Sequence, residues 1–222
     1  MTRNRLTLAL SVLIALSSPL AAAQEGISKV NGSIDVDAGQ QRGNLETVNG
    51  SIKVGDNARV GSAETVNGGI HVGAGSQTGG LETVNGSIRL GAKTTASSDL
   101  ETVNGGIFVD RGGAVSGDIE TVNGAIGLVD ADVSGGIETV NGDVTVGVDS
   151  HVRGGIKYTK PRGNFQLKPQ RDPRVVIGPN ARVDGPLVFE RKVQLYVHAS
   201  AKTGPITGAT AVAFNTPTPP AQ

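Results

Sequence analysis

The sequence repeats one pentapeptide, Glu-Thr-Val-Asn-Gly, at an almost constant interval. A degenerate copy, Val30-Asn31-Gly32, comes first, and six complete copies follow it. The asparagines of successive copies are 18 or 19 residues apart. A fixed period of this length is typical of a chain whose repeats stack on one another, so that each repeat contacts only its neighbours. The repeat therefore restricts the fold to an array or solenoid.

A finer pattern divides each period into three parts. In residues 45–62 the valines lie six residues apart at Val48, Val54 and Val60, and Ile52 lies two residues before Val54. Spacing by two is the period of a β-strand, and the intervening glycines suit corners. Helical periodicity is absent from the repeats. The sequence therefore predicts an all-β fold: a triangular parallel β-solenoid with three short strands per coil of about 18 residues.

Two structural alternatives accompany this prediction. Asn-Gly is a strong hairpin signal, so a meander of hairpins is the rival architecture. Within one coil, the six-residue interval places Val48 inside, whereas strict alternation from Leu45 does not. We therefore expect a corner or bulge near Thr47, with Glu46 outward.

The sequence outside the repeats suggests further segments. Residues 1–23 combine Arg3 and Arg5, an apolar run and a final Ala21-Ala22-Ala23, which is the layout of a secretory signal peptide. The apolar run is too short to span a bilayer comfortably. We expect export to the periplasm or the cell surface. We predict the repeat solenoid over residues 24–156, a proline-containing basic arm over 157–174, further coils over 175–208 and a disordered tail over 209–222.

The near-zero net charge conceals an uneven distribution. Residues 24–156 contain 8 basic and 17 acidic residues, whereas residues 157–222 contain 10 basic and 3 acidic residues. The predicted arm concentrates six of these basic residues: Lys157, Lys160, Arg162, Lys168, Arg171 and Arg174. Such an arm is either a solvated loop, a contact to the acidic rod of a neighbouring molecule, or a contact to an anionic envelope polymer. Nucleic acid is not an expected partner, because the rod is acidic.

Stacking of the coils predicts two polar rows along the rod. The asparagines are expected to hydrogen-bond from coil to coil; they are Asn49, Asn67, Asn85, Asn104, Asn123 and Asn141. The glutamates form an outward row of repelling charges; they are Glu46, Glu64, Glu82, Glu101, Glu120 and Glu138. This row is either a solvated face or a stripe that binds a cation, for which calcium is the plausible ion.

The sequence offers no constellation of catalytic residues and no expected cofactor. His71 and His151 each precede a valine expected to face inward, which predicts isolated surface histidines, and His198 lies in the C-terminal coils. Cysteine is absent, and no His/Cys spacing suits a metal site.

The segment Val176-Ile177-Gly178-Pro179-Asn180-Ala181-Arg182-Val183-Asp184-Gly185-Pro186-Leu187, together with the repeats, resembles the bactofilin-type polymer-forming proteins and the adhesin-type β-strand-repeat proteins of bacteria. The resemblance implies a β-helical rod that self-assembles without nucleotide. The signal peptide departs from the cytoplasmic setting of typical bactofilins. We therefore expect a non-enzymatic structural or interaction protein of the bacterial cell envelope. The alternatives are a module that docks to an anionic envelope polymer and, last, a β-helical carbohydrate-active enzyme.

Overall fold

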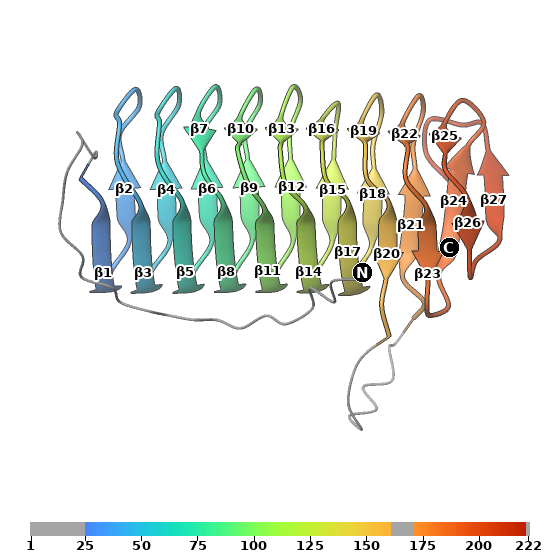
Figure 1. Ribbon diagram of the computed structural model, residues 1–222, viewed down its shortest axis with the longest axis horizontal. Coiled ribbons are helices and arrows are strands. Elements are labelled where there is room, and N and C mark those ends of the chain that lie inside the picture. Colours follow the sequence, from blue (N-terminus) through green and yellow to red (C-terminus); the bar gives the residue numbers. More distant parts are fainter. Residues whose placement is uncertain (1–24, 161–170, 221–222) are drawn as a thin grey trace, which may run out of the picture.

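The computed structural model describes residues 25–160 and 171–220, and these form one rod of stacked β-coils (Figure 1). Within these residues there are 27 strands and no helix. The strands assemble into two ten-stranded sheets and one seven-stranded sheet, and every recorded pair of strands is parallel. The prediction of a three-sided parallel β-solenoid is confirmed, and the hairpin meander is excluded.

The first sheet contains the repeated pentapeptides. Its strands are β1 (Ile27–Asn31), β3 (Leu45–Asn49), β5 (Ala63–Asn67), β8 (Leu81–Asn85), β11 (Leu100–Asn104), β14 (Ile119–Asn123), β17 (Ile137–Asn141), β20 (Ile156–Tyr158), β23 (Leu187–Phe189) and β26 (Ile206–Thr207).

The second sheet follows the first around each coil. Its strands are β2 (Ile34–Val36), β4 (Ile52–Val54), β6 (Ile70–Val72), β9 (Ile88–Leu90), β12 (Ile107–Val109), β15 (Ile126–Leu128), β18 (Val144–Val146), β21 (Arg174–Ile177), β24 (Gln194–His198) and β27 (Ala211–Phe214).

The third sheet is the narrowest. Its strands are β7 (Gln77–Thr78), β10 (Thr95–Ala96), β13 (Ala114–Val115), β16 (Asp132–Val133), β19 (His151–Val152), β22 (Arg182–Val183) and β25 (Lys202–Thr203). In the first coils single bridges from Gln41 to Arg59 and from Arg59 to Gln77 continue this sheet.

The core is a stack of like residues between the three sheets. Ile52, Ile70 and Ile88 are successive register partners in the second sheet, and all three are fully buried. Their outward neighbours Lys53 and His71 are exposed. The alternation of a two-residue period thus separates core from surface on each strand. Because every coil lies at the ordinary inter-strand spacing of about 4.8 Å from the next, the backbone hydrogen bonds run along the rod.

The first-sheet strand corrects our assignment of its inward residues. Leu45 and Thr47 are buried, Glu46 is exposed and Val48 is only partly buried. Strict alternation from Leu45 therefore holds, and the bulge expected at Thr47 is not needed. The threonine hydroxyl is accommodated because it donates to a glycine carbonyl of the preceding coil: Thr47 to Gly32 (3.0 Å), Thr65 to Gly50 (2.8 Å), Thr83 to Gly68 (2.8 Å), Thr102 to Gly86 (2.9 Å) and Thr121 to Gly105 (3.1 Å).

The glycine of each pentapeptide lies too close to the preceding coil for any side chain. A Cβ atom added at Gly68 would lie 2.0 Å from the carbonyl oxygen of Gly50, and one added at Gly124 would lie 1.8 Å from that of Gly105. The corner between the second and third sheets has a different requirement, a left-handed residue. Asn57, Asp149 and Asn180 supply it with φ of 55°, 55° and 56°, and these are residue types that tolerate this conformation.

The C-terminal part of the chain differs from the expected segments in two places. Residues 156–158 and 174–177, at the ends of the predicted arm, are strands β20 and β21 of the rod, and Tyr158 is fully buried. The prediction of a disordered tail from residue 209 is wrong for Ala211–Phe214, because these residues form β27 and pair with β24. The predicted signal peptide, residues 1–23, lies outside the described residues.

Thr83 and Val84 provide a direct test of which side chain faces the core. We expect Thr83→Val to lower the free energy of unfolding by about 1–3 kcal/mol, because the partly buried carbonyl of Gly68 loses this donor. We expect Val84→Thr to change it by less than about 0.5 kcal/mol, because this side chain is partly exposed. Urea denaturation of the two variants measures the difference, and equal losses would contradict the assignment.

The close approach of glycine corners predicts a steep cost for a single methyl group. At Gly86 an added Cβ would lie 1.9 Å from the carbonyl oxygen of Gly68, whereas at Gly80 the nearest atom, the Asp99 carbonyl oxygen, would be 3.4 Å away. We expect Gly86→Ala to cost about 3 kcal/mol or more, since the backbone itself must move. The matched Gly80→Ala should change stability by about 1 kcal/mol or less. Thermal melts that rank the two variants the other way would refute this account.

Candidate functional site

The asparagine side chains form one continuous row along the corner of the rod. Each donates from Nδ2 to Oδ1 of the asparagine one coil earlier, at 2.9–3.1 Å, from Asn49 on Asn31 through to Asn141 on Asn123. An amide both donates and accepts, so a column of identical amides satisfies itself. This role is structural, and it accounts for the asparagine of the pentapeptide without any ligand.

Arg191 ends this row at its C-terminal side. Its Nη1 donates to Oδ1 of Asn141 and to the carbonyl oxygen of Val140, the latter at 2.8 Å. The sequence analysis missed Arg191. The sole signal was indirect: the coil after Asn141 has no asparagine of its own, so the last amide oxygen needed another donor.

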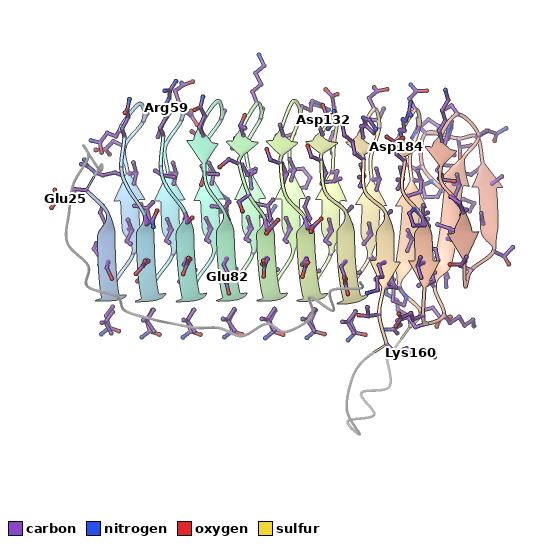
Figure 2. The ribbon with its side chains drawn as sticks, in the orientation of Figure 1. Glu25, Arg59, Glu82, Asp132, Lys160 and Asp184 are labelled. Carbon is purple, nitrogen blue, oxygen red and sulfur yellow. The ribbon has the colours of Figure 1, made fainter. Side chains whose placement is uncertain are left out.

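The six glutamates occupy equivalent outward positions on neighbouring strands of the first sheet. Figure 2 shows Glu82 on the face of β8, and register pairs join Glu46 to Glu64, Glu64 to Glu82 and so on to Glu138. Like charges directly opposite one another are destabilising. The row ends at Lys157, which is the register partner of Glu138 and lies 3.3 Å from it, Nζ to Oε1.

Glu120 has the most altered ionisation in the row. Burial, which is the largest cause, and the charges of Glu101, Glu138, Asp118 and Asp99 together raise its pKa to about 7. The two aspartates precede the strands β11 and β14. Their carboxylates are held by backbone amides: Asp99 accepts from Asp118 N and Asp118 from Gly136 N, both at 2.7 Å. Burial and the flanking glutamates also raise the pKa of Glu64.

A cation stripe needs several oxygens that converge on one point. A hollow of about 100 Å³ lies beside Glu64, Glu82, Asp99 and Glu101. Within residues 25–160 and 171–220, however, no group of three or more His, Cys, Asp or Glu side chains is arranged to hold a metal ion. Calcium binding stays a prediction, and the parallel row gives it no support.

The described ends of the predicted basic arm, residues 157–160 and 171–174, are held against the rod. Lys157 contacts Glu138, Arg171 binds Asp143 through two nitrogens at 3.1 and 2.6 Å, and Arg174 lies over the ring of Tyr196 with its guanidinium carbon 4.9 Å from the centroid. The backbone amide of Lys160 donates to Glu190 at 3.3 Å. Arg162 and Lys168 lie outside the described residues. Three of the six cations thus have partners within the chain.

The histidines are not all isolated surface residues. His71 is exposed, as expected. Nε2 of His151 lies 2.8 Å from Asp184 and its Nδ1 lies 3.7 Å from Asp132, so this ring bridges carboxylates of two other coils. A hydrogen bond from Arg182, and then one from His151, lower the pKa of Asp184. The ring of His198 packs edge-on against Phe214, with centroids 5.0 Å apart. These contacts join neighbouring coils.

No family model, no curated protein and no solved structure matches the chain. The structure therefore confirms the parallel β-solenoid fold that the resemblance implied. Membership of the bactofilin-type or adhesin-type families stays a prediction. In the described part of the chain, no helix has the length and apolar character needed to cross a membrane.

The raised pKa of Glu120 predicts how stability depends on pH. The folded protein holds this proton up to about pH 7, whereas the unfolded chain releases it near the ordinary value of 4.5. The contribution of Glu120 to the free energy of unfolding therefore falls as pH rises from about 4.5 to about 7. Glu120→Gln removes this dependence, so the variant should match the natural protein below about pH 4.5 and melt at a higher temperature at pH 8.

Thermal melts across this pH range test the expectation. Glu46→Gln is the matched control, because Glu46 is exposed and has Ser28 instead of a glutamate as one register partner. If the melting temperature of Glu120→Gln changes with pH in parallel with that of the natural protein, Glu120 does not titrate as described.

Proposed function

We propose that the protein is a rigid, non-enzymatic scaffold of the bacterial cell envelope, exported through residues 1–23. The observation that carries this proposal is the role of the pentapeptide. Its threonine, asparagine and glycine each serve the contact between one coil and the next. The repeats therefore build length and stiffness, since each added coil extends the rod by about 4.8 Å.

An enzyme would require a different arrangement of side chains on its surface. Catalysis depends on unlike groups, such as an acid, a base and a binding pocket, placed close together. The outward rows of the first sheet repeat the same side chain at equal intervals, which suits a uniform face. The signal-peptide layout and the lack of cysteine agree with a scaffold outside the cytoplasm whose stability comes from stacking.

Self-assembly is a second candidate activity, and the ends of the sheets favour it. Strands β1 and β2 are the first strands in their sheets, and β26 and β27 are the last. Strand β1 is largely exposed, and its recorded partner is β3 alone. An open strand edge is a template for pairing with another chain, so end-to-end contact between copies is the form of assembly that the rod favours.

Cell fractionation and electron microscopy together test the proposal of an exported scaffold. We expect the protein in the periplasmic or surface fraction, with a mass that lacks residues 1–23, and we expect electron micrographs of the mature chain to show rods of uniform width. A panel of polysaccharides should yield no new reducing ends. Accumulation in the cytoplasm with an intact N-terminus, or release of reducing sugar that scales with protein concentration, would contradict the proposal.

A further inference from the structure

The outward column of the second sheet is polar in its first four coils, from Asp35 to Arg89, and this polar run ends at Phe108. Register pairs place Phe108 between Arg89 on β9 and Gly127 on β15. In the preceding coils the same position is occupied by Lys53 and His71. Phe108 is thus an aromatic side chain on the outer face of a regular coil, and it is only partly buried.

Gly127 makes room for this ring. It lies in the middle of β15, where no corner requires a glycine, and its φ is not in the left-handed region. A Cβ atom at this position would lie 3.2 Å from Cδ2 and 3.8 Å from Cε2 of Phe108. The glycines of the complete pentapeptides meet backbone atoms of the preceding coil, whereas Gly127 meets only this ring. The ring therefore lies over the glycine, as aromatic side chains do beside strand glycines.

The arrangement leaves a hollow of about 270 Å³ on the face of the second sheet. Phe108 and Gly127 form its apolar part, and Ser87, Arg89 and Thr145 contribute polar side chains. This volume is slightly below the range typical of pockets for drug-sized ligands, so the hollow suits a ligand group about the size of one six-membered ring. Apolar walls with a few polar groups are the usual composition of a small-ligand site.

A second hollow adjoins the first. Its volume is about 280 Å³, and Arg171, Pro173 and Arg191 line it together with the corner at Asn141. Ala125 and Asp143 line both hollows. The two hollows thus adjoin at these two residues, and we refer to them together as the groove; its lining extends from Phe108 on the second sheet to the corner at Asn141.

Three arginines line the groove, and only Arg171 is paired with its carboxylate, so Arg89 and Arg191 have no recorded carboxylate partner among the described residues. Both carboxylate oxygens of Asp143 accept from Arg171, and Oδ1 also accepts from the backbone amide of Arg174 at 2.8 Å. Arg191 contacts only neutral oxygens, those of Val140 and Asn141, and both contacts use Nη1. Among residues 25–160 and 171–220, no recorded hydrogen bond uses its Nε or Nη2, which are the donors suited to a carboxylate.

We propose that this groove binds an acidic glycan, with a sugar ring against Phe108 and a carboxylate at Arg191. The C–H face of a sugar is apolar and packs on an aromatic ring, while its hydroxyl groups hydrogen-bond to the polar side chains at the rim. A lipid would need a larger apolar patch, and a polyphosphate would need several unpaired cations. The inference deepens the proposed function, since it names the envelope component that the scaffold holds.

Binding of trigalacturonate to the full mature chain tests the proposal, with the uncharged methyl ester of the same trisaccharide and inorganic phosphate as separate arms. By titration calorimetry we expect the acid to bind at least about tenfold more tightly than the ester, since a charge-assisted pair is lost. Phosphate should neither bind comparably nor displace the sugar. Equal affinity for the ester would refute the role of Arg191, and equal affinity for phosphate would reduce the groove to a simple anion site.

Four variants locate the site. Phe108→Leu keeps an apolar side chain over Gly127 but removes the ring, Gly127→Thr places a side chain against the ring and displaces it, and Arg191→Lys and Arg191→Gln change the cation. We expect Phe108→Leu, Gly127→Thr and Arg191→Gln to weaken binding about tenfold or more, and Arg191→Lys to weaken it less. The controls are His71→Thr, in the same outward column, and Arg182→Gln, on the third sheet. They should bind as the natural protein does.

Thermal melts of each variant distinguish loss of the groove from loss of the fold. Folded Phe108→Leu and Gly127→Thr variants that bind with unchanged affinity would overturn the proposal. That failure would leave the scaffold untouched, because localisation, rod shape and lack of hydrolysis do not depend on this groove.

Discussion

The stacking of each coil on an almost identical coil, at one inter-strand spacing, is the constraint on which the rest of this structure depends. Every position must tolerate a copy of itself about 4.8 Å away along the rod. Isoleucine on isoleucine meets this condition by packing, and asparagine meets it because an amide both donates and accepts. Glycine at the first corner meets it by having no side chain where the preceding carbonyl lies 1.8–2.3 Å from a hypothetical Cβ. The pentapeptide is the sequence consequence of this condition.

The same condition explains how the regular array ends. Where the repeat stops, each self-matching residue is replaced by one that complements it. Lys157 follows the glutamates and pairs with Glu138, and Tyr158 follows the threonines and donates to the carbonyl of Gly142 at 2.8 Å. The ring of Tyr158 packs beside Phe189, with centroids 5.6 Å apart, which fills the interior of the later coils. Arg191 ends the asparagine row by donating to Asn141, as Lys157 ends the glutamate row by pairing with Glu138. The basic region is thus largely the closing structure of an acidic, self-repeating rod.

The architecture could be predicted from the sequence because one repeat period determines the path of every coil. The orientation and contacts of individual side chains could not always be predicted. The six-residue interval of the valines suggested that Val48 faces the core, but the buried residue is Thr47. Hydrophobicity misleads here because the threonine hydroxyl finds an acceptor in the preceding coil, a contact that depends on the stacked structure. Arg191 and Asn141 are 50 residues apart, and no local pattern connects them. Residues 209–222 as a whole are rich in Ala, Thr and Pro, which suggested disorder, but the short apolar segment Ala211–Phe214 within them pairs with β24 as strand β27.

The glutamate row is the one part of the pentapeptide that stacking disfavours. Its members face outward, and each repels the next. A neutral residue would stack more easily, so the row contributes a property other than stability. It gives the first sheet a negative field that extends over roughly 8 Å at physiological ionic strength. The groove at Phe108 and Arg191 opens on the second sheet and its corner, where Arg171 has already neutralised Asp143. The acidic ligand that we propose would therefore be repelled from the first sheet and attracted to the groove, so the separation of charge along the rod favours one side for its binding.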